Sequence, residues 1–176
     1  YDIPVFYFPK FFHPDPSVKR QSGLIKPAIN NSNVLGTSFT LPYFKVISES
    51  KDLTLTPTWF DNDTLMSTIE YRQENKNSSL ITDFAFVNAY KSPTTKKKNS
   101  LSHFFLDYNL DLKLENYISS KFAMSIDRVS NDSYLNVFDQ YLTKSNLRPN
   151  DFNRLTNEIK ILLDHDNDNF QAGFQG

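Results

Sequence analysis

Alternation of apolar and polar side chains over long segments constrains this chain more than any other feature. Between Phe104 and Leu114 every second residue is apolar, and most residues between them are polar. A period of two places the two sets on opposite faces of a β-strand. Alternation over about eleven residues matches a tilted strand that crosses a bilayer, whereas strands of soluble proteins average about 5–6 residues. The segment therefore predicts a strand of an outer-membrane barrel.

The same period recurs along most of the chain. Leu35 and Phe39 share a predicted face, and Leu53 and Leu55 share another. Clusters of Asn, Asp and Ser, which favour tight turns, separate these segments. We predict an all-β fold, an antiparallel meander that forms part of an outer-membrane β-barrel. The predicted strands are 22–30, 34–46, 53–60, 65–73, 80–90, 102–114, 121–129, 154–164 and one that begins at Phe170.

Residues 133–150 break the alternation. Their apolar residues fit a helical period slightly better than a period of two. We predict a long loop that contains a short helix.

Composition limits the classes of function. The chain has 176 residues, a net charge of −1, four Gly and no Cys. A nearly neutral chain has no broad basic field, so we expect no nucleic-acid partner. The lack of Cys removes disulfide and thiolate-metal sites. No apolar run is long enough for a transmembrane helix, which does not exclude a barrel.

No residues suggest catalysis, a cofactor or a metal. His13, His103 and His165 are isolated, and we expect each to be solvated. Residues 164–168 begin like a calcium loop but lack its later Gly and Glu, so a polar turn is the preferred interpretation. Residues 96–98 are three lysines, interpreted as a solvated loop tip, with attraction to anionic membrane phosphates as the alternative. The sequence argues against an enzyme.

The N-terminal residues differ from the rest. Tyr1–Phe12 is apolar and aromatic but is interrupted by two prolines, which predicts an edge or terminal strand. Pro14-Asp15-Pro16 then forms a stiff extended linker. Because the chain begins inside a predicted strand, we interpret it as an interior part of a longer protein.

Several short motifs resemble the LPS-assembly protein LptD, or organic-solvent-tolerance, family. The resemblance is most specific over the first third of the chain, where Leu24 and Lys45 depart from the family's aromatic residues. The motifs that carry it are Val5-Phe6-Tyr7-Phe8-Pro9, Lys19-Arg20-Gln21-Ser22-Gly23-Leu24, Leu41-Pro42-Tyr43-Phe44 and Leu53-Thr54-Leu55-Thr56-Pro57.

This resemblance implies a domain organisation, a location and partners. Residues 1–12 would end a periplasmic β-jellyroll, 13–21 would be a linker, and 22–176 would hold about the first nine or ten strands of an outer-membrane barrel. Lys19, Arg20, Ser22 and Gly23 would form the motif at the start of the barrel. The implied partners are lipopolysaccharide, an LptA-like periplasmic bridge protein, an LptE-like lipoprotein plug and membrane lipid.

The resemblance also implies that Pro27 and Pro42 form a lateral gate. A proline inside a ladder removes a hydrogen-bond donor, and in lipid no water replaces the lost bond. The first strand would close the barrel against the last strand, so a weak seam there could open sideways. With a hairpin turn at Asn31-Ser32, Pro42 would lie opposite Ser22, and Pro27 would lie in the middle of its strand.

Two other readings stay open at this stage. A soluble β-sandwich that binds glycans also has strands with one apolar face, so alternation cannot separate it from a barrel. A porin, or an enzyme built on a barrel with catalytic groups outside this chain, is the third reading.

Overall fold

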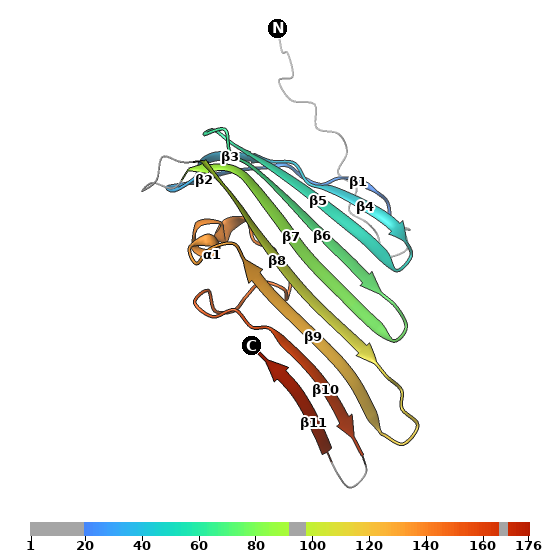
Figure 1. The fold of residues 1–176 in the computed structure, drawn as a ribbon. Helices are drawn as coiled ribbons and strands as arrows, with labels where there is room; N and C mark the ends of the chain where they lie inside the picture. The colour runs from blue at the N-terminus through green and yellow to red at the C-terminus, as the bar shows by residue number, and fades with distance from the viewer. Residues whose placement is uncertain (1–19, 92–97, 166–168) are drawn as a thin grey trace.

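The computed structural model describes residues 20–91, 98–165 and 169–176, which form one antiparallel sheet (Figure 1). Within these residues, no helix has the length and apolar character needed to cross a membrane. The predicted all-β antiparallel meander is confirmed. The strands are β1 (Gly23–Leu24), β2 (Ala28–Ser32), β3 (Gly36–Thr40), β4 (Tyr43–Ser48), β5 (Lys51–Phe60), β6 (Leu65–Glu74), β7 (Ser78–Lys91), β8 (Lys98–Asp111), β9 (Ser119–Val129), β10 (Glu158–Asp164) and β11 (Asn169–Gln175), and the short helices are α1 (Tyr134–Val137) and the 3₁₀ helix η1 (Asp139–Tyr141).

The sheet is open among the described residues. From β5 onward each strand pairs with the next one in the chain, so β11 lies at one edge, and β1 and β2 lie at the other (Figure 1). A β-sandwich needs two sheets packed face to face. The described residues form a single sheet, so the sandwich reading is wrong for this part of the chain.

Every strand predicted from residue 22 onward is present, but some boundaries differ. The strand predicted for residues 1–12 lies outside the described residues. The strand predicted for 102–114 is β8, which begins earlier, at Lys98, and ends at Asp111. Lys113 has a φ of 52°, in the left-handed region, and its N–H bonds to the Asp111 carboxylate at 3.3 Å. This local turn ends the ladder although the alternation continues through Leu112 and Leu114, because periodicity says nothing about where a partner strand stops.

The connections between strands lie at the two ends of the sheet. The linker end carries the connections 49–50, 75–77 and 112–118, together with Arg20 and His165. The opposite end carries the connections 33–35, 61–64 and 130–157. The last of these is by far the longest and contains α1 and η1.

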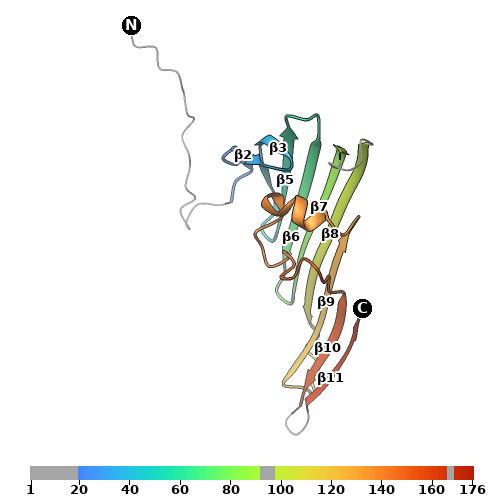
Figure 2. The ribbon, with the colours of Figure 1, turned by 90° about the vertical axis from the view of Figure 1, so that its left-hand side faces the viewer.

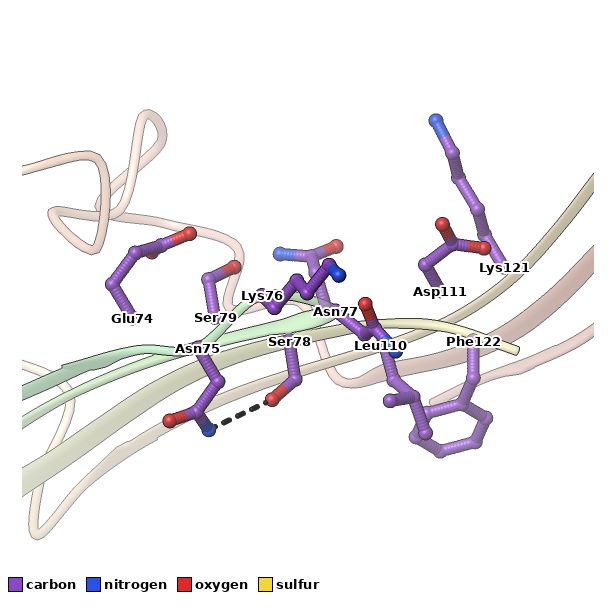
Figure 3. Close-up of a pocket in the computed structure, with 11 residues that line it drawn as sticks. Glu74, Asn75, Lys76, Asn77, Ser78, Ser79, Leu110, Asp111, Lys121 and Phe122 are labelled. Atoms are coloured by element: carbon purple, nitrogen blue, oxygen red, sulfur yellow. Dashed lines mark hydrogen bonds between the residues drawn. The ribbon is translucent and has the colours of Figure 1, made fainter. Parts of the chain in front are cut away.

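The alternation separates two faces of different chemistry. The outer face is apolar and includes Trp59, which is 45% exposed. Residues paired across neighbouring strands on this face are also apolar, as in the register Leu55–Ile69–Phe84–Phe104 across β5 to β8. The inner face has the register Asp52–Arg72–Ile81–Asp107 across the same strands. Figure 3 shows both faces at the linker end, with Asp111 and Lys121 on one side of the ribbon and Leu110 and Phe122 on the other.

Residues 130–157, the inner segment, fold back against the inner face. In Figure 2, α1 and the chain after it lie on one side of the sheet, beside β6 and β7. Tyr134 and Phe138 are 0% exposed and pack against Tyr90 of β7 and His103 of β8. The short helix predicted within 133–150 is confirmed. The inner segment supplies one side of a hydrophobic core that a single sheet would lack.

Leu35 belongs to this core as well. Its side chain is 1% exposed and lies in the cluster formed with the inner segment. It is not in a strand, because Ser32 Oγ accepts hydrogen bonds from the Val34 and Leu35 N–H groups and closes the hairpin turn there. The prediction that Leu35 and Phe39 share a strand face is therefore wrong.

Candidate functional site: the proline-interrupted corner

The first two strand passes are broken at the same level of the sheet. β1 and β2 are separated at residues 25–27, and β3 and β4 are separated at residues 41–42. Pro27 and Pro42 occupy these two breaks. The structure therefore places the two predicted gate prolines beside each other, in the hairpin that forms one edge of the sheet.

The break is also a change of register. Ile25 donates its N–H to the Pro42 carbonyl at 2.8 Å, and the next regular pair toward the turn is Ala28 with Thr40. Between these pairs the first pass has two residues, Lys26 and Pro27, whereas the second has only one. An extra residue on one side is a β-bulge, which bends its strand and disrupts the ladder.

The predicted pairing of Pro42 with Ser22 is wrong. The hairpin turns at residues 33–35 instead of Asn31-Ser32, and this moves Pro42 to a position opposite Ile25. The Ser22 hydroxyl instead accepts the Val46 N–H at 2.9 Å. Turn position sets the register of the whole hairpin, so a short misplacement of the turn shifts every pair.

Pro57 of β5 is a third proline at this level. Leu41 donates its N–H to the Pro57 carbonyl at 3.2 Å. In an antiparallel pair the residue opposite would return a bond, but Pro57 has no N–H and leaves the Leu41 carbonyl without that donor. Pro42 likewise returns no bond to Ile25. Sequence reasoning gave Pro57 no role, although the Leu-Thr-Leu-Thr-Pro motif contains it.

The motif predicted to start the barrel reaches this corner. Arg20 contacts the Asp52 carboxylate of β5, and its guanidinium lies 5.6 Å from the centre of the Phe44 ring. Gly23 pairs with Phe44, and a Cβ at Gly23 would meet no atom within 4 Å, so sterics do not demand glycine there. Lys19 lies outside the described residues. We call residues 20–27, 41–48, 52 and 57 the proline corner.

A buried polar cluster joins the inner segment to the sheet. His103 Nε2 lies 3.1 Å from Asp83 Oδ2, and His103 Nδ1 lies 2.9 Å from the Tyr134 hydroxyl. The His103 ring stacks on Phe105 with a centroid distance of 4.3 Å. The prediction of a solvated His103 is wrong: it is 1% exposed because the inner segment covers an inward-facing position of β8.

This cluster has no features of an active site beyond its residue types. Asp83 and Tyr134 are 0% exposed. Neither they nor His103 line either of the two cavities at the linker end. Burial, with a contribution from the negative charge of Asp83, raises the pKa of Tyr134 well above its usual value. The hydroxyl therefore stays protonated and available as a donor, and the arrangement anchors the inner segment.

The remaining sequence candidates add no site. Among the described residues no group of three His, Asp or Glu side chains could hold a metal ion. The calcium-like motif lies in the β10–β11 turn, and residues 166–168 of it are outside the described residues, as are residues 96–97 of the lysine run. His165, at the same turn, contacts the Tyr117 ring edge-on at 6.0 Å. His13 is also outside the described residues.

Two cavities lie at the linker end. One, of about 330 Å³, lies beside the β6–β7 turn, where Asn75 bonds to Ser78 at 3.1 Å (Figure 3). The other, of about 580 Å³, is lined by Arg20, Asp52 and Arg72. The second cavity therefore shares Arg20 and Asp52 with the proline corner.

Comparison with known proteins points in one direction. The chain is 25% identical to LPS-assembly protein LptD of Pseudoalteromonas translucida over 147 residues, which are 82% of this chain and 18% of that protein. It is 26% identical over 138 residues to LptD of Idiomarina loihiensis, covering 78% and 17%. It resembles part of an LPS-assembly protein.

A shorter match is stronger per residue. The chain is 38% identical over 71 residues to LptD of Shewanella oneidensis, covering 40% of this chain and 9% of that protein. No family model matches the chain. The chain spans less than a fifth of the length of the curated relatives named here.

Proposed function

We propose that this chain is part of an outer-membrane lipopolysaccharide translocon, in which the proline corner is a lateral gate. The translocon receives lipopolysaccharide from an LptA-like periplasmic bridge protein and inserts it into the outer leaflet. An LptE-like lipoprotein plugs the barrel, and catalysis plays no part. Residues 1–12 end a periplasmic β-jellyroll, 13–21 form the linker and 22–176 form the first part of the barrel.

The observation that carries this proposal is the broken ladder at the edge of the sheet. Pro27 and Pro42 lie together in the first hairpin, and the register changes between them. The edge strand is therefore held to its neighbour by few backbone bonds. If the last strand of the complete barrel pairs with this edge, the seam is weakest where the lipid would leave.

The two faces of the sheet support a membrane location. The outer face presents large apolar side chains from β5 to β11, and Phe39 and Trp59 stack at 6.0 Å near the opposite end. Lipid-facing strands alternate apolar and polar residues in this way, with aromatic residues near the interfaces. The inner face is polar near the linker end, which suits passage of the sugar portion of lipopolysaccharide.

The gate role is tested in the full-length protein by replacing both prolines. The double variant Pro27→Ala, Pro42→Ala restores two N–H donors, so the hairpin should open less often and less lipopolysaccharide should reach the cell surface. Pro149→Ala is the matched control, because Pro149 lies in the inner segment and outside the ladder. Normal surface lipopolysaccharide in the double variant would exclude the gate role.

A further inference from the structure

The cluster formed by Arg20, Asp52 and Arg72 lies on the inner face at the linker end. Asp52 of β5 is 4% exposed, and its carboxylate contacts both arginines. Arg72 Nε lies 2.8 Å from Asp52 Oδ1, and Arg72 also lies 3.7 Å from Glu70. One buried carboxylate is thus shared by an arginine of the sheet and an arginine of the segment before the first strand.

This geometry links elements that the backbone joins only weakly. The ladder between β1 and β4 consists of two residue pairs, Gly23–Phe44 and Leu24–Tyr43. Arg20 reaches past β4 to contact β5, and it also lies over the Phe44 ring. Its ion pair therefore crosses the hairpin that the prolines weaken.

Charge and burial favour a positioning role over binding of a free anion. Glu49 and Glu74 line the same cavity as the two arginines, so acidic groups outnumber the cations there. A buried carboxylate keeps its charge only while cations and donors contact it. Arg20 and Arg72 have side chains that are 45% and 46% exposed, so either can leave Asp52 without first crossing a packed core.

We propose that Asp52 is a positioning residue that holds the first strand against the sheet through Arg20. While the pair is formed, the edge of the sheet stays closed. When Arg20 leaves, the contacts among the described residues that hold the part of the hairpin before the bulge are two ladder pairs, the Ile25–Pro42 bond and the Ser22–Val46 bond. The strength of this ion pair then sets how often the proline corner opens.

Hydrogen exchange in the full-length protein tests this inference directly. The N–H groups of Ile25 and Val46 bond across the hairpin, so peptides that contain them report its opening. Asp52→Asn and Arg20→Gln should each speed exchange over residues 22–48 by about tenfold. Arg20→Lys keeps a cation and should restore most of the protection.

Two controls separate positioning from general destabilisation. Glu74→Gln removes a negative charge beside the same cavity, and Glu74 takes no part in the ion pairs found among the described residues. It should leave exchange over 22–48 unchanged. Peptides from β7 and β8 should exchange at the original rate in all variants. Unchanged exchange over 22–48 in Asp52→Asn and Arg20→Gln, or equal acceleration in β7 and β8, would overturn the inference.

Only the link from opening of the proline corner to lipopolysaccharide export rests on the proposed function. The same variants test the role of Asp52 and the gate role separately. If the corner is the gate, the variants with faster exchange should make cells sensitive to large antibiotics that an intact outer membrane excludes. Faster exchange with an unchanged permeability barrier would keep Asp52 as the residue that holds the corner and would refute the gate. Slower or unchanged exchange refutes the role of Asp52, whatever the permeability.

Discussion

Removing His103 should release the inner segment from the sheet. The Asp83 carboxylate is 0% exposed, one of its oxygens has no partner, and the other is bonded to His103 at 3.1 Å. His103→Leu therefore leaves a buried charge without a hydrogen bond. Leaving a buried charged group without its hydrogen-bond partner costs about 3 kcal/mol or more. Water reaches Asp83 only when the inner segment lifts away from the sheet. The substitution therefore destabilises the state in which the inner segment is packed on the sheet and leaves the released state unaffected.

The N–H groups of the short helix measure this release. Val137 and Phe138 bond to the Ser133 and Tyr134 carbonyls at 3.0 and 2.9 Å, and they exchange only when the segment opens. A cost of about 3 kcal/mol corresponds to exchange at least about 100-fold faster. In the His103→Leu background, the neutral isostere Asp83→Asn should recover much of this protection. Acceleration below about tenfold, or no recovery in the double variant, would refute the buried-charge argument.

Four further predictions concern the proline corner, the inner segment, the two faces of the sheet and the turn of the first hairpin. Pro57→Ala supplies an N–H to the opposite carbonyl, worth about 0.5–1.5 kcal/mol, and should slow exchange in the first hairpin; faster exchange would contradict this. Burial raises the pKa of Tyr134, so attachment of the inner segment to the sheet is fully favoured below pH about 10 and weakens above it. Limited proteolysis should show faster cleavage of the inner segment above this pH in the wild type but not in Tyr134→Phe. On the outer face Ile69→Arg should lower the free energy of unfolding by about 2–4 kcal/mol and reduce the heat-modifiable folded form on gels. Thr68→Arg on the inner face should be tolerated, and equal effects of the two substitutions would argue against lipid contact. Gly36 has a φ of 75° beside a neighbouring carboxylate, so Gly36→Ala should cost about 1–2 kcal/mol in urea unfolding, and an unchanged midpoint would contradict the strain.

The proline corner was only partly predictable from the sequence. Pro27 and Pro42 stand out because prolines are rare inside strands, and their motifs resemble a known family. Their mutual position depends on where the hairpin turns, and Ser32 closes that turn later than the Asn-rich sequence suggests. Pro57 has the same chemistry, but it becomes part of the corner only through its pairing with Leu41.

The buried cluster could not be predicted at all. Asp83, His103 and Tyr134 are separated by 20 and 31 positions in the chain, and no spacing rule connects them. His103 lies on the same strand face as Asp107 and Asn109, and a polar face predicts contact with water. Only the return of the inner segment across that face converts a position that looks solvated into a buried one.

The sequence by itself determined the strands and the chemistry of their two faces. Alternation is a local property, because each residue's face follows from its neighbours along the same strand. Tertiary structure alone decided the bulge, the contact between Arg20 and Asp52 and the placement of the inner segment. Each of these depends on pairing or packing between residues far apart in the chain, where many registers satisfy the same alternation and only the complete set of contacts selects one.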